Sequence, residues 1–135
     1  ILSLDKAARR LNAVNTVKNY NHNDTDRFDS IMLYLHENYQ KRITLSEVAK
    51  LTNMSDASLM RFLKKWTVKT FIDNLNEIRV AEAVSRMTDT SDSISEICYR
   101  CGFNNLSNFN RVFKRRRGST PTEYREKYSR SRFII

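Results

Sequence analysis

The chain repeats one helical pattern at an offset of 49 residues. Residues 44–54 read TLSEVAKLTNM, and residues 93–103 read SISEICYRCGF. After one extra residue in the second copy, RFLKK at 61–65 matches RVFKR at 111–115 with an offset of 50. Each copy has the spacing of a helix, a tight turn and a second helix, so the sequence predicts a duplicated helix-turn-helix unit.

The fold class follows from turn residues and apolar spacing. The chain has 135 residues with only 2 Gly and 1 Pro, too few for the many tight turns of a sandwich or barrel. Its apolar residues recur at helical spacing. We therefore predict an all-α protein of about seven helices.

The predicted helices and linker divide the sequence into four parts. Residues 1–26 are expected to form a short amphipathic helix over 2–17 and a polar linker. The first helix-turn-helix unit covers 27–70, a linker helix covers 71–88, and the second unit covers 89–135. Helix starts are marked by N-cap residues followed three positions later by an acidic residue. These pairs are Thr44 with Glu47, Thr70 with Asp73, Ser93 with Glu96, and Thr120 with Glu123.

The turns and the linker helix have their own signals. Gly102 and Asn53 stand where each first helix reverses, which favours left-handed backbone. Ala49 and Cys98 share one position, where a small side chain lets helices cross closely. The linker helix carries two apolar sides, which predicts that it serves two cores. One side holds Phe71, Ile72, Leu75 and Ile78, and the other holds Val80, Ala83, Val84 and Met87.

Positive charge is concentrated in the second part of the chain. The net charge is +9, and residues 61–135 carry 16 basic against 8 acidic side chains, compared with 8 and 7 in residues 1–60. This asymmetry indicates a polyanionic partner, although a solvated basic surface is the alternative. No apolar run approaches the roughly 18 residues of a membrane span. We expect a cytoplasmic protein without a membrane partner.

The two second helices have matching faces. At about 100° per residue, one side of each is apolar and the other is polar and basic. The apolar sets are Leu59, Phe62, Leu63 and Trp66 in the first copy, and Phe109, Val112 and Phe113 in the second. The outward sets are Ala57, Ser58, Met60, Arg61, Lys64 and Lys65, and Ser107, Asn108, Asn110, Arg111, Lys114 and Arg115.

Such faces suit major-groove recognition of DNA. An Arg in the middle of the helix can pair with guanine O6 and N7, whereas Lys and flanking Arg reach phosphates more often. We therefore expect Arg61 and Arg111 to discriminate bases. An ordinary solvated helix face is the alternative, and the repetition in both copies argues against it.

Several motifs resemble the signature of the AraC/XylS transcription regulators. They are SEI at 95–97, GFNN at 102–105, FNRVFK at 109–114 and GSTPTEYR at 118–125. The resemblance covers about residues 27–128 and implies two helix-turn-helix subdomains joined by a linker helix, which bind double-stranded DNA. With the helix faces, it gives the expected DNA-binding residues. They are Ala57, Ser58, Met60, Arg61, Lys64, Lys65, Asn105, Leu106, Ser107, Asn108, Arg111, Lys114 and Arg115.

The resemblance also implies partners. Members usually carry a separate ligand-sensing or dimerising domain, so this chain is expected to be the C-terminal piece of a longer regulator. RNA polymerase and a homodimer formed through the upstream domain are the implied partners. The alternative is a trimmed version of a short protein.

Two positions depart from the family pattern. Val68 stands where members usually have Gly, so the helix end after Trp66 is expected to close differently. Leu106 stands where members often have a polar residue. It can contact a thymine methyl group or fold back on Phe109 and Phe103, and we favour the second arrangement.

Other functions have weaker support. Cys98 and Cys101 form a C-x-x-C motif, but a structural zinc site needs four ligands, and His22 and His36 lie far upstream. We therefore expect packing cysteines, no metal and no cofactor. The sequence has no phosphate-binding glycine loop or catalytic triad signature, so we expect no enzyme. A basic helical module that binds nucleic acid non-specifically or docks a protein remains the alternative function.

The linker helix sets an expectation for groove spacing. At 1.5 Å per residue, 17 residues span about 26 Å, which can bring two recognition helices close to the roughly 34 Å of one DNA turn. We therefore predict that one chain enters two successive major grooves.

Overall fold

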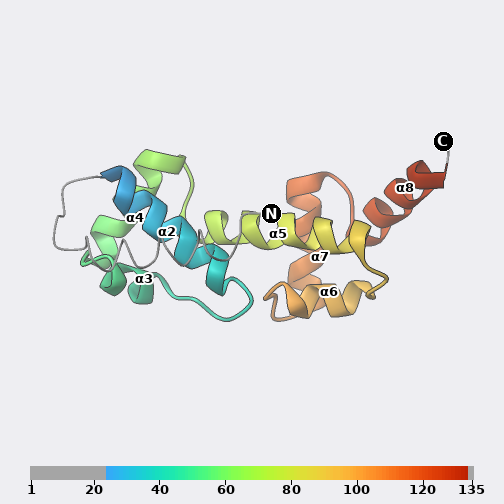
Figure 1. Ribbon diagram of the computed structural model, residues 1–135, viewed down its shortest axis with the longest axis horizontal. Helices are drawn as coiled ribbons and strands as arrows, with labels where there is room; N and C mark the ends of the chain where they lie inside the picture. The colour runs from blue at the N-terminus through green and yellow to red at the C-terminus, as the bar shows by residue number, and fades with distance from the viewer. Residues whose placement is uncertain (1–23, 134–135) are drawn as a thin grey trace. The chain divides into compact units, whose positions relative to one another are not determined.

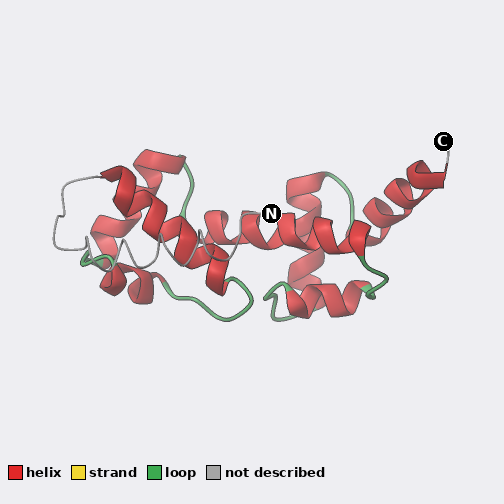
Figure 2. Cartoon of the chain, viewed as in Figure 1, coloured by secondary structure: helices red, strands yellow, loops and turns green. Residues whose placement is uncertain are grey.

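The computed structural model describes residues 24–133, which form seven helices and no strand (Figures 1 and 2). The all-α prediction is confirmed. None of the described helices has both the length and the apolar character of a membrane span. The helices are α2 (Asp24–Asn38), α3 (Leu45–Leu51), α4 (Asp56–Thr67), α5 (Phe71–Asp89), α6 (Ile94–Arg100), α7 (Leu106–Arg117) and α8 (Pro121–Phe133).

The expected N-terminal segment is only partly testable. The helix predicted over 2–17 lies outside the described residues. The first described helix, α2, begins at Asp24, within the last three residues of the segment predicted as a polar linker. Its first turn carries Asp24 and Asp26, whose negative charges favour the N-terminal end of a helix.

The described chain forms two compact units. The first unit contains α2, α3 and α4, with a core built from apolar residues of all three helices. Tyr34 of α2 donates a hydrogen bond to the Glu47 carboxylate of α3, and this bond raises the pKa of Tyr34 to about 12. The fully buried residues of this unit include Ile31, Leu35, Val48, Leu59 and Leu63.

Trp66 differs from its predicted place in that core. Its side chain remains 37% exposed. Its ring stacks on Phe28 and Phe62, with centroid distances of 5.2 and 5.6 Å. Trp66 therefore covers the edge of the core, because it lies in the last turn of α4, beyond the buried residues.

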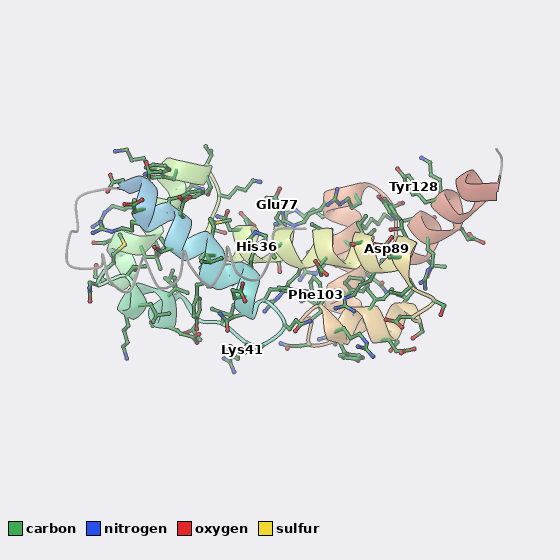
Figure 3. The ribbon with its side chains drawn as sticks, in the orientation of Figure 1. His36, Lys41, Glu77, Asp89, Phe103 and Tyr128 are labelled. Atoms are coloured by element: carbon green, nitrogen blue, oxygen red, sulfur yellow. The ribbon has the colours of Figure 1, made fainter. Side chains whose placement is uncertain are left out.

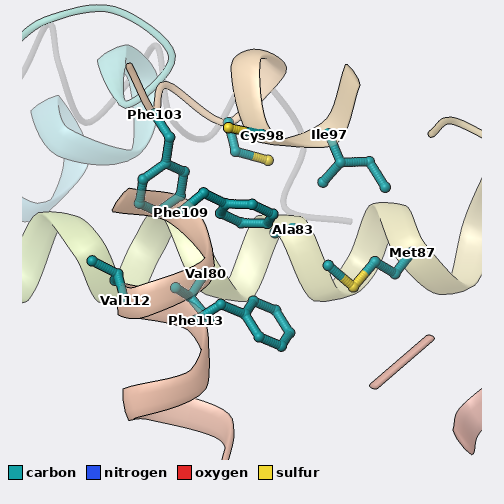
Figure 4. Packing of buried hydrophobic residues seen from close by; sticks show 10 residues of the cluster. Val80, Ala83, Met87, Ile97, Cys98, Phe103, Phe109, Val112 and Phe113 are labelled. Atoms are coloured by element: carbon teal, nitrogen blue, oxygen red, sulfur yellow. The ribbon is translucent and has the colours of Figure 1, made fainter. Parts of the chain in front are cut away.

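The second unit contains most of α5 together with α6, α7 and α8. Its core joins one face of α5 to α6 and α7, with Phe109 beside Phe103 and Phe113 (Figure 4). The aromatic contacts continue to α8, where Phe113 meets Tyr124 and Tyr124 meets the more exposed Tyr128. Figure 3 labels Tyr128 on this helix. The buried cluster comprises Val80, Ala83, Met87, Ile97, Cys98, Cys101, Phe103, Phe109, Val112 and Phe113.

The linker helix has two apolar sides, as predicted, except at one position. Phe71, Leu75 and Ile78 are buried, whereas Ile72 is 57% exposed. Ile72 lies about 100° around the helix from Phe71, while Leu75 and Ile78 lie within about 40° of it. The assignment of Ile72 to the buried side is therefore wrong.

The helix caps agree with the sequence in most details. Ser93 and Glu96 form a reciprocal capping box, as do Thr120 and Glu123. The backbone N–H groups that these carboxylates accept from lower the pKa of Glu96 and Glu123. At α3, the Thr44 hydroxyl accepts from the Glu47 N–H. The Glu47 carboxylate accepts a hydrogen bond from the Tyr34 hydroxyl. At α3, the capping glutamate therefore links the helix start to α2.

The turn predictions are also confirmed. Asn53 has φ 56° and Gly102 has φ 94°, both in the left-handed region. Ala49 and Cys98, at the equivalent position of the two first helices, are 1% and 0% exposed. The two copies therefore reverse and pack in the same manner.

The end of α4 closes like the end of α7, contrary to the prediction from Val68. Val68 has φ 60° and its N–H donates to the Lys64 carbonyl at 3.0 Å. Gly118 has φ 83° and its N–H donates to the Lys114 carbonyl at 2.8 Å. The hydrogen bond thus forms with either residue, and the β-branched residue adopts a strained backbone conformation.

Exchanging the two residues should reveal this strain. We expect Val68→Gly to raise the free energy of unfolding by about 0.5–1 kcal/mol, because relief of left-handed strain exceeds the entropy cost of glycine. Gly118→Val should lower the free energy of unfolding by a similar amount, because the new side chain is strained in left-handed backbone. No atom lies within 4 Å of the added Cβ, so no steric clash increases this cost. Urea unfolding followed by Trp66 fluorescence measures the first change, and circular dichroism measures the second. Equal stability of Val68→Gly and the parent would contradict the strain.

Candidate nucleic-acid interface

Helix α4 presents the first half of the candidate interface. Ser55 caps the helix by accepting a hydrogen bond from the Ser58 N–H at 3.1 Å. Burial of Leu59, Phe62 and Leu63 on one side turns the opposite side towards solvent. The exposed residues on that side are Ala57, Met60, Arg61, Lys64 and Lys65.

Helix α7 presents the second half in the same manner. Asn105 is its N-cap, and its side-chain oxygen accepts from the Asn108 N–H at 2.8 Å. Phe109, Val112 and Phe113 are buried on the inner side. The exposed candidate residues are Leu106, Ser107, Arg111, Lys114 and Arg115.

Ser58 and Asn108 are half-buried, unlike the other candidate residues. Each accepts a hydrogen bond from the arginine three positions further along its helix. The Arg61 Nη2 to Ser58 Oγ distance is 3.3 Å, and the Arg111 Nη2 to Asn108 Oδ1 distance is 2.6 Å. The structure therefore places these two candidates beside the arginines rather than at the outermost surface.

Leu106 remains partly exposed, and its contact with a thymine methyl group or with Phe109 and Phe103 stays a prediction. It is 36% exposed and lies outside the hydrophobic cluster that contains Phe103 and Phe109. As the first residue of α7, it precedes the buried side of the helix. Its side chain remains available for an apolar contact.

Two arginines, one at the end of α7 and one in α8, have structural roles that the charge pattern does not reveal. Arg116, in the basic run at the end of α7, is half-buried and lies 3.5 Å from the Asp73 carboxylate. Arg125 of α8 donates to the carbonyls of Thr90 and Asp92, in the segment after α5. Arg117, the last of four consecutive basic residues at 114–117, is exposed and is a further candidate for this interface.

The two cysteines lie in the core of the second unit. Both are free and 0% exposed. Burial raises the pKa of the Cys98 thiol and raises that of Cys101 to about 11. The prediction that they are packing residues is confirmed. Within residues 24–133, no group of three or more His, Cys, Asp or Glu side chains is arranged to hold a metal ion.

Comparison with known proteins identifies this arrangement. The profile of the helix-turn-helix domain matches residues 48–127, more than half of the chain. The chain belongs to the AraC/XylS family. The matched residues run from α3 to α8 and include both candidate recognition helices.

Curated relatives of this AraC/XylS chain are transcription regulators. It is 26% identical over 111 residues to the transcriptional activator RhaR of Mannheimia succiniciproducens, covering 82% of the chain and 40% of that relative. It is 30% identical over 104 residues to the activator RhaS of an Enterobacter species, covering 77% of the chain and 37% of that relative. The chain thus spans less than half the length of these relatives.

Solved structures share the fold. The C-terminal domain of the response regulator AraT from Geobacillus stearothermophilus has 28% identity and a TM-score of 0.71, covering 75% of this chain and 84% of that one. The DNA-binding domain of AdpA, solved with a target DNA, has a TM-score of 0.74 at 23% identity and covers 79% and 96%. The second likeness supports the fold.

Proposed function

We propose that this chain is the sequence-specific DNA-binding part of a transcription regulator, with α4 and α7 as its two recognition helices. The observation that carries the proposal is the repeated outward face behind repeated caps and buried residues. On both helices an exposed arginine lies six residues after the N-cap, at Arg61 and Arg111, with basic residues one turn further along.

The chemistry of these side chains assigns their roles. Arg61 and Arg111 can each form two hydrogen bonds with guanine O6 and N7. The basic residues after them contact phosphates and contribute affinity for any sequence. These residues are Lys64, Lys65, Lys114 and Arg115.

The two helices should prefer different sequences. Beside its arginine, α4 exposes Ala57 and Met60, which favour apolar contact with a thymine methyl group. At the equivalent positions α7 exposes Ser107 and Asn110, which can hydrogen-bond to bases. A single chain therefore needs no palindrome.

Footprinting of the monomer tests the proposed binding mode. On a site selected from random DNA, we expect protection over two successive major grooves, about 10 base pairs apart. Arg61→Ala should remove the preference at one base pair in one groove, and Arg111→Ala should do so at one base pair in the other. A footprint confined to one groove would contradict the proposal. It would mean that only one unit binds DNA and that the other supports it structurally.

Non-specific binding is the competing function, because the chain is strongly basic with a net charge of +9. Affinities for the selected site and for random DNA, measured at several salt concentrations, separate the two. Equal affinities at each salt concentration would favour the non-specific module.

We further propose that the whole protein acts in the cytoplasm, dimerises through an upstream domain and contacts RNA polymerase.

A further inference from the structure

Both proposed base-reading arginines are tied to the residue three positions before them. Arg111 donates from Nη2 to the Asn108 side-chain oxygen at 2.6 Å, and Arg61 donates from Nη2 to the Ser58 hydroxyl at 3.3 Å. Ser58 and Asn108 occupy equivalent positions, 50 residues apart. The same contact with different side chains indicates a shared role.

Each of these acceptors is itself adjacent to the helix cap. The Asn108 backbone N–H donates to the Asn105 side chain at 2.8 Å. In α4, the Ser55 hydroxyl accepts from the Ser58 N–H at 3.1 Å and also lies 2.9 Å from the Ser58 hydroxyl. The cap therefore fixes the first turn, and the first turn holds the acceptor under the arginine.

We propose that Asn108 and Ser58 are positioning residues, which set base specificity by orienting Arg111 and Arg61 rather than by contacting DNA. This inference rests on the proposed function. A guanidinium has five N–H donors, so one bond to Asn108 leaves Nη1 and the second Nη2 hydrogen free for guanine. The half-burial of both acceptors agrees with a place beneath the arginine.

The restraint is stronger in α7 than in α4. The Arg111–Asn108 contact is 2.6 Å long, whereas the Arg61–Ser58 contact is 3.3 Å long. The Ser58 oxygen also lies 2.9 Å from a second hydroxyl, that of Ser55, so it is shared between two partners. Loss of the acceptor should therefore cost more specificity at Asn108 than at Ser58.

A double-mutant cycle on the whole chain tests this inference. Asn108→Ala should lower the preference for the base pair recognised by Arg111 by about three- to tenfold, because the long side chain must then be ordered on binding. Affinity for random DNA should stay within about twofold. In the Arg111→Ala background, Asn108→Ala should have no effect on preference. Asn108→Ser, which keeps an acceptor, should restore part of the preference in the Arg111 parent.

Controls separate positioning from the other roles of an asparagine. Circular dichroism should give the same unfolding midpoint for Asn108→Ala and the parent, since a stability loss would weaken all DNA sequences alike. An equal loss of affinity for random DNA would show a phosphate contact, and a preference change that persists without Arg111 would show a direct base contact. Either result overturns the inference. If Arg111→Ala itself leaves the preference unchanged, the base-reading role proposed for Arg111 fails, whatever the result for Asn108→Ala.

Discussion

Replacing Gly102 by Asn is expected to lower the free energy of unfolding by about 2–3 kcal/mol. Any side chain is strained at the φ of 94°, and the added Cβ brings a second, steric cost. That atom would lie 2.2 Å from the Tyr39 carbonyl oxygen and 2.9 Å from Arg79 Nε. Because Arg79 donates to the same carbonyl at 2.9 Å, moving the carbonyl breaks a charge-assisted hydrogen bond.

The first copy of the repeat supplies the matched control. Asn53→Gly, at the equivalent turn, should change stability by less than about 1 kcal/mol, because Asn53 is exposed and already adopts φ 56°. Gly102→Ala should cost about 1 kcal/mol more than Gly102→Asn, since Ala tolerates left-handed backbone less well. Urea unfolding followed by circular dichroism measures all three. A Gly102→Asn protein as stable as the parent would refute the close approach.

The role of this turn illustrates what sequence alone could predict. The left-handed backbone at Gly102 follows from a local signal, a glycine after a helical pattern. The approach of Tyr39 does not, because these residues are far apart in the chain and meet only in the folded second unit. Arg79 likewise donates to Tyr39 and Lys41, about 40 residues earlier, which helical spacing cannot indicate.

Helix faces were predictable because burial follows helical period over short distances. Leu59 and Phe109 are fully buried, as their spacing predicts. Trp66 and Leu106 are exceptions at helix ends, past the buried residues, whereas Ile72 is an exception because it lies about 100° around α5 from Phe71. Each is more exposed than the pattern suggests.

The candidate site shows the same limit. Exposure of Arg61 and Arg111 follows from the helix faces. The separate roles of the neighbouring polar residues become visible only in their hydrogen bonds. Asn105 was grouped with DNA-binding residues, and its side chain caps α7. Arg116 belongs to the basic run at the end of α7, yet it lies 3.5 Å from the Asp73 carboxylate. Composition counts such charges without showing which ones are already paired.

Replacing Arg111 by Ala is expected to cost about 1–3 kcal/mol of binding free energy on the preferred site, or roughly 5- to 150-fold in affinity. The loss should be confined to sequences with the preferred base pair, because the side chain proposed to pair with guanine is removed. Lys114→Ala is the matched control one turn along the same exposed face. It should weaken binding to every sequence alike and reduce the salt dependence by about one counterion.

Competition binding against single-base variants of the site separates these outcomes. Arg111→Ala should flatten the preference at one base pair, whereas Lys114→Ala should leave the whole pattern of preferences unchanged. Arg61→Ala should flatten a different base pair, about 10 base pairs away, because it belongs to the other proposed recognition helix. If Arg111→Ala keeps the parent ratio of preferred to random DNA, Arg111 contributes charge alone. Base recognition by α7 would then have to come from Ser107, Asn110 or Leu106, which are exposed on the same helix.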